Sequence, residues 1–229
     1  MRDSEAGRPM LPPLPDSPLL AGIGQETARR LVAALQPTVR RYEKGEALVL
    51  AGYENKRIGL VLAGHMDAVR TGPEGEQLAM AHMGPGGVFG DVLSGSHGHK
   101  SPVTVLARGT VTALWLPCEA VLAGPADSAL RPAHLQLLRN WVGMLADKYF
   151  ALDTRIELLM TKSLRARVLR YLEGRPSDAG GWVLLPPTRT QLAAYLGCNR
   201  AALSRELGRM VQDGVLELDG GRARGHLPE

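Results

Sequence analysis

The chain has 229 residues, of which 45% are hydrophobic and 22% charged, a composition typical of a soluble globular protein with room for two modest domains. The net charge of only +4 excludes a polycation that coats nucleic acid indiscriminately. Two distant cysteines, Cys118 and Cys198, exclude a disulfide framework, a zinc finger and a cysteine-ligated iron–sulfur cluster. Neither a membrane-spanning apolar run nor a signal peptide is evident, so we expect a cytoplasmic protein.

The N-terminal part of the chain changes from proline-rich to helical. Residues 1–17 are rich in proline and follow neither a helical nor a strand period, which predicts a mobile leader. A short helix is expected at about Gln25–Leu35, with Ala28 and Leu31 on one side and Pro37 after its end.

Residues 38–118 have the pattern of a β domain. Short β-type runs alternate there with glycine turns: Ala47–Ala51, Ile58–Ala63, Met66–Arg70, Gln77–Met83, Val103–Ala107 and Val111–Leu116. Several short strands separated by regular turn signals predict an antiparallel sandwich or barrel.

The period then becomes that of a heptad repeat, which starts just after Pro132. Apolar residues are spaced alternately three and four apart at Leu135, Leu138, Val142, Leu145, Tyr149, Leu152, Ile156 and Leu159. Positions a and d of a heptad sustained over about four repeats predict a coiled-coil dimer seam. A long helix packed against its own β domain is the alternative.

Residues 188–210 predict two short helices joined by a tight turn. Gly197 suits the end of the first helix, and Asn199 suits the N-cap of the second. The second helix would bury Leu203, Leu207 and Met210. This pattern predicts a helix-turn-helix with a recognition helix, whereas an ordinary helical hairpin is the alternative.

A β-hairpin is expected after the second helix. Residues 215–227 alternate apolar and polar around a turn at 219–221, so they predict a wing on which Arg222 and Arg224 suit phosphate contact. Trp182–Leu185 would add a further strand to the same small sheet.

A β domain, a long helix and a winged helix-turn-helix, in that order, resemble the Crp–Fnr family of bacterial transcription regulators. The segments that carry the resemblance are Tyr42–Leu48, Ile58–Gly64 and Met83–Asp91 with their glycines, Thr188–Gly197, and Arg200–Leu207. The resemblance implies an α+β fold with an N-terminal antiparallel β-roll of the cyclic-nucleotide-binding type (a double-stranded β-helix). The expected divisions are a leader at 1–17, an effector-sensing β-roll at 18–130, a dimerisation helix at 131–162 and the winged helix-turn-helix at 163–229.

The resemblance also implies which residues contact DNA. The expected set is Thr188, Arg189, Thr190, Asn199, Arg200, Ala201, Ser204, Arg205, Arg209 and Arg222. Arg205 would be the principal base reader, because its guanidinium can donate to guanine O6 and N7 together. Ala201 departs from the glutamate usual in the family, so we expect a half-site that differs from the family's commonest sequences.

The effector segment of cyclic-nucleotide-binding relatives corresponds here to residues 90–101. The residues that would hold an effector are Gly90, Asp91, Val92, Lys100, Ser101 and, on the long helix, Tyr149. Asp91 and Lys100 replace the family's glutamate and arginine in a loop that is one residue short, which weakens the case for a cyclic nucleotide without excluding it.

Three histidines, His82, His97 and His99, are candidate haem ligands near the same loop. The sequence therefore leaves four alternatives for the effector: a cyclic nucleotide, haem, another small organic or anionic molecule, or no effector.

The expected partners are a palindromic DNA site, a second copy of the chain, a small-molecule effector and RNA polymerase. A ligand-binding regulatory module without DNA binding is an alternative of a different class. We do not expect an enzyme, because the motifs of serine hydrolases, P-loop nucleotide hydrolases and zinc peptidases do not occur.

Overall fold

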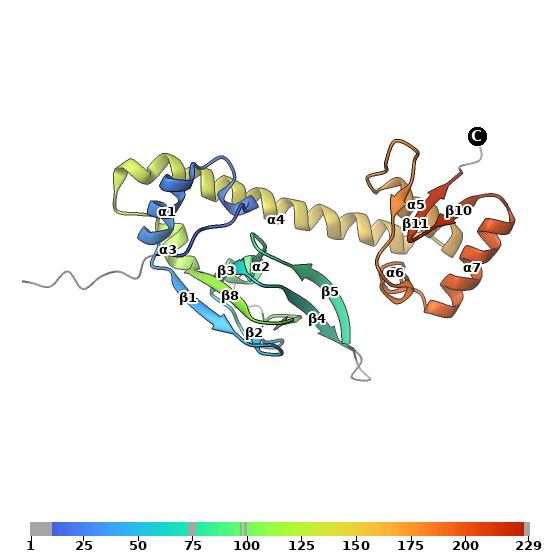
Figure 1. Ribbon diagram of the computed structural model, residues 1–229, viewed down its shortest axis with the longest axis horizontal. Coiled ribbons are helices and arrows are strands. Elements are labelled where there is room, and N and C mark those ends of the chain that lie inside the picture. Colours follow the sequence, from blue (N-terminus) through green and yellow to red (C-terminus); the bar gives the residue numbers. More distant parts are fainter. Residues whose placement is uncertain (1–10, 73–76, 97, 99, 227–229) are drawn as a thin grey trace, which may run out of the picture. The chain divides into compact units, whose positions relative to one another are not determined.

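The computed structural model describes residues 11–72, 77–96, 98 and 100–226. The chain forms two compact units, Met1–Asp147 and Lys148–Glu229, and the division falls within the long helix α4, Arg131–Met160. The first unit contains two β-sheets with short helices, and the second contains the helices and the small sheet of a winged helix-turn-helix (Figure 1).

The β-roll consists of two four-stranded antiparallel sheets (Figure 1). The first sheet has the order β1 (Thr38–Tyr42), β8 (Val111–Pro117), β3 (Arg57–Ala63), β6 (Val88–Phe89). The second has the order β2 (Ala47–Val49), β7 (Thr104–Ala107), β4 (Met66–Thr71), β5 (Gln77–Met83). The antiparallel β domain expected from the glycine-punctuated runs is therefore confirmed.

The first sheet has apolar side chains on both faces. Leu114 and Leu116 of β8 belong to a core shared with helices, whereas Ala113 and Trp115 belong to a second core between the two sheets. Because side chains alternate along a strand, a strand covered on both sides is an almost unbroken apolar run, as β8 is.

Three helices cover the outer face of the first sheet (Figure 1). They are α1 (Gln25–Ala34), α3 (Cys118–Ala123) and the first turns of α4, which follow a short 3-10 turn at Ser128–Leu130. Leu137 and Trp141 of α4 are buried in this core. The buried His134 at the start of α4 donates from Nε2 to the carbonyl of Val121 at 2.7 Å, which fixes α3 to α4.

The mobile leader predicted for residues 1–17 is wrong for residues 11–17, while residues 1–10 lie outside the described part of the chain. Leu14 is only 5% exposed. Ser17 caps the 3-10 turn Pro18–Leu20 and donates from its hydroxyl to the Gly86 carbonyl at 2.8 Å. The segment is therefore held by burial of leucines and by hydrogen bonds, neither of which has a period visible in the sequence.

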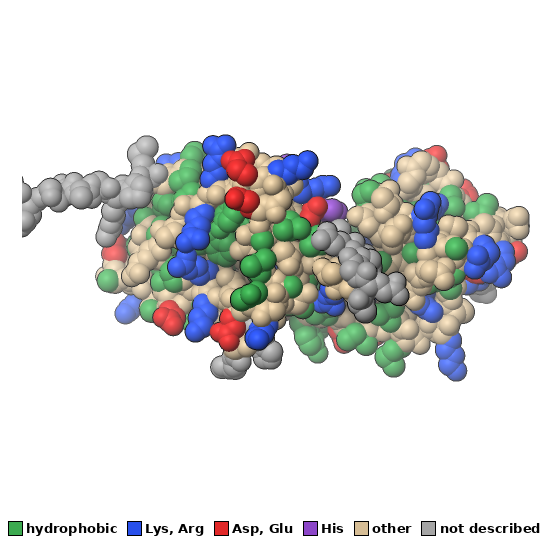
Figure 2. Space-filling model, turned by 90° about the horizontal axis from the view of Figure 1, so that it is seen from below, with side chains coloured by type: hydrophobic (Ala, Val, Ile, Leu, Met, Phe, Trp, Pro, Cys, Tyr) green, Lys and Arg blue, Asp and Glu red, His purple; other side chains and the backbone are tan. Residues whose placement is uncertain are grey.

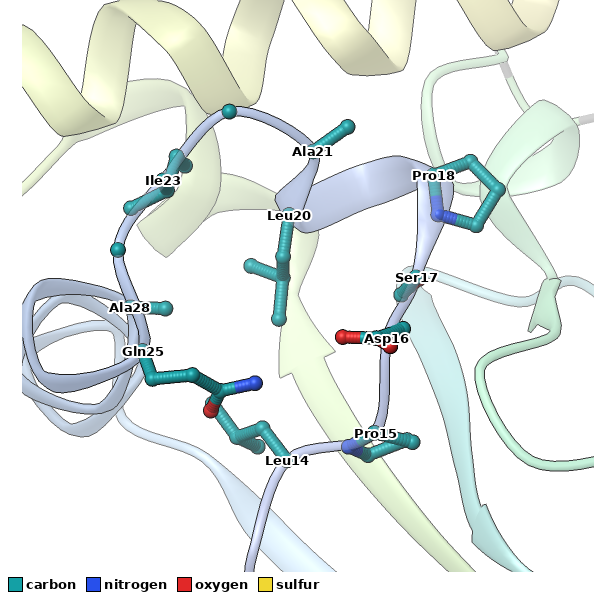
Figure 3. Close-up of a pocket in the computed structure, with 12 residues that line it drawn as sticks. Leu14, Pro15, Asp16, Ser17, Pro18, Leu20, Ala21, Ile23, Gln25 and Ala28 are labelled. Carbon is teal, nitrogen blue, oxygen red and sulfur yellow. The ribbon is translucent and has the colours of Figure 1, made fainter.

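The same N-terminal segment curls around a cavity of about 640 Å³ formed by residues 14–28 (Figure 3). Leu20 points into this cavity, and the polar ends of Asp16 and Gln25 face it from opposite sides. All the lining residues come from this one stretch of chain, so the cavity does not include the predicted effector residues.

Helix α4 is continuous over 30 residues, as the heptad predicts. Six of the eight predicted seam residues are exposed in the single chain: Leu135 at 53%, Val142 at 64%, Tyr149 at 64%, Leu152 at 61%, Ile156 at 56% and Leu159 at 42%. Leu138 and Leu145 are instead partly buried against the core of the first unit, so they are not purely seam residues. Leu137 and Trp141 lie outside the heptad pattern, so the heptad did not predict that they are buried. They give the helix a second apolar side.

The second unit has the predicted winged architecture. Helices α5 (Leu164–Glu173), α6 (Arg189–Tyr195) and α7 (Arg200–Gln212) pack around one core. A three-stranded sheet has the order β10 (Leu216–Asp219), β11 (Arg222–Gly225), β9 (Val183–Leu184). The wing hairpin and the extra strand near Trp182 are therefore confirmed.

Sequence patterns missed β1, β6 and the short helix α2 (Asp91–Ser94). Strand β1 contains charged residues on both faces and β6 has only two residues, so neither has a detectable alternation. Among the described residues, no helix combines the length and the apolarity needed to cross a bilayer.

Candidate DNA-binding and effector sites

Side-chain caps define the two helices of the helix-turn-helix. The hydroxyl of Thr188 accepts from the backbone N–H of Gln191 at 3.2 Å, and the Gln191 side chain accepts in return from the backbone of Thr188. Gly197 makes the turn at a φ of 64°. Asn199 accepts from a backbone N–H of the next turn at 2.7 Å, so α7 begins at Arg200. Two predicted DNA-contacting side chains, Thr188 and Asn199, thus also have a structural role.

Helix α7 separates a buried apolar face from an exposed face. Leu203, Leu207 and Met210 are buried. The predicted base and phosphate contacts on this helix are all exposed: Arg200, Ala201, Ser204, Arg205 and Arg209. The structure therefore brings these five residues together on one accessible surface.

The arginines of that surface differ in their charge partners. Arg209 Nη2 lies 3.0 Å from Glu206 Oε2. Within the described residues, no carboxylate lies in ion-pair distance of Arg200 or Arg205. These two guanidinium groups are thus available for an external acceptor such as a phosphate or a guanine edge.

Glu206 also connects α7 to α5. Arg165 Nε lies 3.1 Å from Glu206 Oε1, and its Nη2 lies 2.5 Å from Asp213 Oδ2. Hydrogen bonds to these two carboxylates raise the pKa of Arg165. The network fixes the inner side of α7 and leaves its outer side accessible.

The wing arginines are paired within the wing region. Arg222 Nη2 lies 2.7 Å from Asp219 Oδ2, and its Nη1 lies 3.5 Å from Asp178 Oδ2. Arg224 lies 2.7 Å from Glu217 and stacks over the ring of Trp182 at 4.9 Å. A phosphate contact by Arg222 would therefore have to compete with two carboxylates.

Two arginines hold the turn of the helix-turn-helix. Arg155, near the end of α4, donates from Nη2 to the Ala194 carbonyl at 3.2 Å. Arg167 of α5 donates from Nη1 to the Leu196 carbonyl at 2.6 Å. These bonds add side-chain donors to carbonyls at the C-terminal end of α6, where the regular helical pattern ends. Sequence patterns gave no signal for either contact, because each joins segments 29 or more residues apart.

The start of α6 borders a hollow of about 220 Å³ near the wing turn. Thr188, Arg189 and Gly221 line it together with apolar residues. Arg189 is half-buried, and its Nη1 is buried without a hydrogen-bond partner in the described part of the chain. The neighbouring Thr190 is exposed.

Five of the six predicted effector residues, all except Tyr149, lie on two adjoining segments of the first unit. Gly90 has a φ of 70°, and a Cβ there would lie 2.4 Å from Asn55 Nδ2, so only glycine fits before α2. Asp91 begins α2 and is buried at 2% exposure. The loop at 52–55 bonds both segments, since Asn55 donates to the Gly90 carbonyl at 3.3 Å and the Tyr53 carbonyl accepts from the Ser101 backbone at 2.8 Å.

Ser101, one of the predicted effector residues, is less available to a ligand than the sequence suggests. Ser101 is 3% exposed, and its hydroxyl donates to the Val103 carbonyl at 2.6 Å. Lys100 and Val92 are exposed. Tyr149 belongs to the second unit, is 64% exposed and contacts the ring of Phe150 edge-on.

His82 is held by a cross-strand hydrogen bond on the second sheet. Its Nδ1 lies 2.5 Å from Asp67 Oδ1, and the other oxygen of Asp67 lies 3.0 Å from Arg108 Nε. His97 and His99 lie outside the described residues. No cluster of three metal-ligating side chains occurs in the ranges described.

Each of the two units contains a segment that matches the model of a known domain family. Residues 39–123 match the model of the cyclic nucleotide-binding domain, and residues 166–226 match that of the Crp-like helix-turn-helix domain. The cyclic AMP receptor protein of Thermus thermophilus is 26% identical over 212 residues, which are 90% of each chain.

Two solved structures share the fold. The catabolite activator protein of Thermus thermophilus is 24% identical with a TM-score of 0.57, over 92% of this chain and 94% of that one. The c-di-GMP responsive global regulator CLP of Xanthomonas campestris is 18% identical with a TM-score of 0.63, over 90% of this chain and 100% of that one. With a β-roll, a long helix and a winged helix-turn-helix in the same order, the chain belongs to the Crp–Fnr family of DNA-binding transcription regulators.

Proposed function

We propose that this chain acts as a homodimer that binds a two-fold symmetric DNA site and changes its DNA affinity when an effector binds the β-roll. The observation that carries the proposal is the exposed face of α7, on which Arg200 and Arg205 have no ion pair within the described ranges. A ligand-binding module without DNA binding would have no use for two uncompensated arginines on that face.

Arg205 is the proposed base reader, with its two donors on guanine O6 and N7. Arg200 and Ser204 suit a phosphate or a second base edge. Ala201 offers only a methyl group, which suits a thymine methyl and cannot accept from cytosine. Selection of binding sites from random DNA should therefore recover a half-site that keeps the guanine but departs from the family's commonest sequences. Recovery of the commonest half-site unchanged would contradict this assignment.

Phosphate contacts are proposed for the start of α6 and for the wing. The buried Nη1 of Arg189, which has no partner in the described part of the chain, supports a phosphate at the hollow beside Thr188. Arg222 is the weaker candidate, because Asp219 and Asp178 already occupy its guanidinium.

The exposed apolar stripe on α4 is the proposed dimer interface. Leaving six large apolar side chains of one helix face in water is unfavourable, and a second copy of the same helix would cover them. A parallel pair would place two copies of α7 about 34 Å apart, the spacing of successive major grooves. In the second unit, Arg155 fixes the C-terminal part of this helix to α6, which gives the interface a direct link to the DNA-reading helices.

The segment 90–101 is the proposed effector site. The name of the Thermus thermophilus relative makes cyclic AMP the first compound to test, although the Ser101 hydroxyl is already bonded. A thermal melt with cyclic AMP at a hundred times its dissociation constant should show about 2.7 kcal/mol of stabilisation. No rise at millimolar nucleotide would retire cyclic AMP as the effector. Contact of the DNA-bound dimer with RNA polymerase completes the proposal.

A pair of variants on α7 tests DNA reading. With a selected operator, Arg205→Gln should weaken binding by about 1–3 kcal/mol and relax the preference at one base pair of each half-site. Arg209→Gln, on the same helix but paired to Glu206, should weaken all sequences about equally. Fluorescence anisotropy on matched and mismatched operators separates the two outcomes. Equal effects of both variants on base preference would contradict the role given to Arg205.

A further inference from the structure

A hollow of about 250 Å³ opens on the first unit. Its lining residues are Arg40, Tyr42, Leu48, Asn55, Arg57 and Trp115. Figure 2 shows Lys and Arg side chains interspersed with Asp, Glu and hydrophobic side chains on the visible face of this unit. None of the residues of this hollow belongs to the predicted effector set.

Strand register places both arginines on the inner face of the first sheet. Arg40 is opposite Ala113, and Arg57 is opposite Pro117, which is two residues from Trp115. Residues directly opposite in an antiparallel pair point to the same side, and Ala113 and Trp115 belong to the core between the sheets. Both guanidinium groups therefore lie at the margin of the inner face, where the edge strand β1 leaves it accessible.

The two arginines lack charge compensation. No carboxylate lines the hollow, and within the described ranges neither Arg40 nor Arg57 is in ion-pair distance of one. Among the residues described, the Arg57 guanidinium makes only a long hydrogen bond of 3.4 Å, to the hydroxyl of Thr38. By contrast, Arg41 on the same strand lies 3.1 Å from Glu43.

The other two polar side chains of the hollow are those of Tyr42 and Asn55. Tyr42 Oη accepts from Trp115 Nε1 at 3.0 Å, which leaves its own hydrogen without an acceptor among the residues described. Asn55 donates to the carbonyls of Arg57 and Gly90 at 2.6 and 3.3 Å, so the rim is tied to the start of α2. Two guanidinium groups and one hydroxyl thus converge without a competing anion.

We propose that this hollow binds a phosphate dianion, either inorganic phosphate or the terminal phosphate of a small organic phosphate. Two positive charges match the charge of a phosphate monoester near neutral pH, and planar guanidinium forks match its oxygens. The volume is below the usual range for a whole small-molecule ligand, so it takes the phosphate and few further atoms. Trp115 is only 4% exposed and serves as a wall rather than a stacking surface. Through Asn55, an occupied hollow would be linked to the segment proposed for the effector.

Isothermal titration calorimetry on the full chain tests the site at fixed ionic strength in chloride. The titrants are inorganic phosphate and glycerol 3-phosphate, up to about 10 mM, ten times a millimolar dissociation constant. Saturable binding of one anion per chain is expected. Tighter binding of glycerol 3-phosphate than of inorganic phosphate would identify an organic phosphate as the ligand, and equal binding would identify the phosphate group alone.

Three variants locate the binding. Arg40→Gln and Arg57→Gln should each weaken it at least about tenfold, the loss expected for one charge-assisted hydrogen bond. Arg41→Gln removes the same charge from the same strand and should change affinity less than about twofold. All three side chains are exposed, so circular dichroism should show the wild-type fold. Absence of saturable heat, an equal loss in Arg41→Gln, or wild-type affinity in Arg40→Gln and Arg57→Gln would overturn the proposal. The experiment does not depend on DNA binding.

Discussion

Truncation of the exposed apolar stripe on α4 should dissociate the proposed dimer. Ile156 is 56% exposed in the single chain and occupies an a position of the heptad. Ile156→Ala removes three side-chain carbons, each worth about 0.8 kcal/mol on complete burial. Scaled by that exposed fraction, the loss is about 1.3 kcal/mol per protomer and about 2.7 kcal/mol per dimer. The dimer dissociation constant should therefore rise about a hundredfold.

Sedimentation equilibrium over a concentration series measures this constant directly. Thr154→Ala is the matched control, because Thr154 is exposed on the opposite side of the same helical turn and should change the constant less than about twofold. Circular dichroism should show an intact helix in both variants. An unchanged dissociation constant in Ile156→Ala would mean that the stripe is not the interface and would refute the coiled-coil argument.

Tyr42→Phe should lower the free energy of unfolding by about 1–3 kcal/mol, measured by urea denaturation, because the buried indole N–H of Trp115 loses its acceptor; unchanged stability would show that this hydrogen bond is dispensable. Gly197→Ala should lower the melting temperature of the second unit, since a left-handed φ costs a non-glycine residue about 1–2 kcal/mol and the new Cβ would lie 2.6 Å from Leu159 Cδ2. A melting temperature equal to wild type would contradict that strain. Hydrogen bonds from the side chains of Arg224 and His226 lower the pKa of Glu217. The folded state therefore favours the ionised form of Glu217. This contribution to stability is complete above the ordinary carboxylate pKa, and it is lost as pH falls through the lowered pKa of the folded state. Glu217→Gln should remove that acid-side decline from pH-dependent melts, and identical declines in both proteins would argue against it.

The winged helix-turn-helix was predictable because its signals are local. Caps such as Asn199, the left-handed turn at Gly197 and the spacing of Leu203 with Leu207 all act within a few residues. The recognition surface follows from that spacing, since a buried stripe fixes which side chains of α7 face outward. The roles of individual DNA contacts remain predictions.

The ion pairs of the candidate DNA-binding site were only partly predictable from the sequence. Arg209 is paired to Glu206 three residues earlier on the same helix, a spacing visible in the sequence. Arg222, by contrast, is paired to Asp178 across the fold. The Arg222–Asp178 pair depends on where two distant segments meet in space, which no short-range period encodes.

The sequence by itself determined the order of the β-roll, the long helix and the winged helix-turn-helix, because turns, caps and hydrophobic periods are properties of neighbouring residues. Only the tertiary structure decided that residues 11–17 are packed rather than mobile, with Leu14 buried. It also decided that Arg40 and Arg57, 17 positions apart in the chain, line one hollow without a carboxylate. The physical reason is that burial and charge compensation arise from contacts between distant segments, which exist only once the sheets have paired in register.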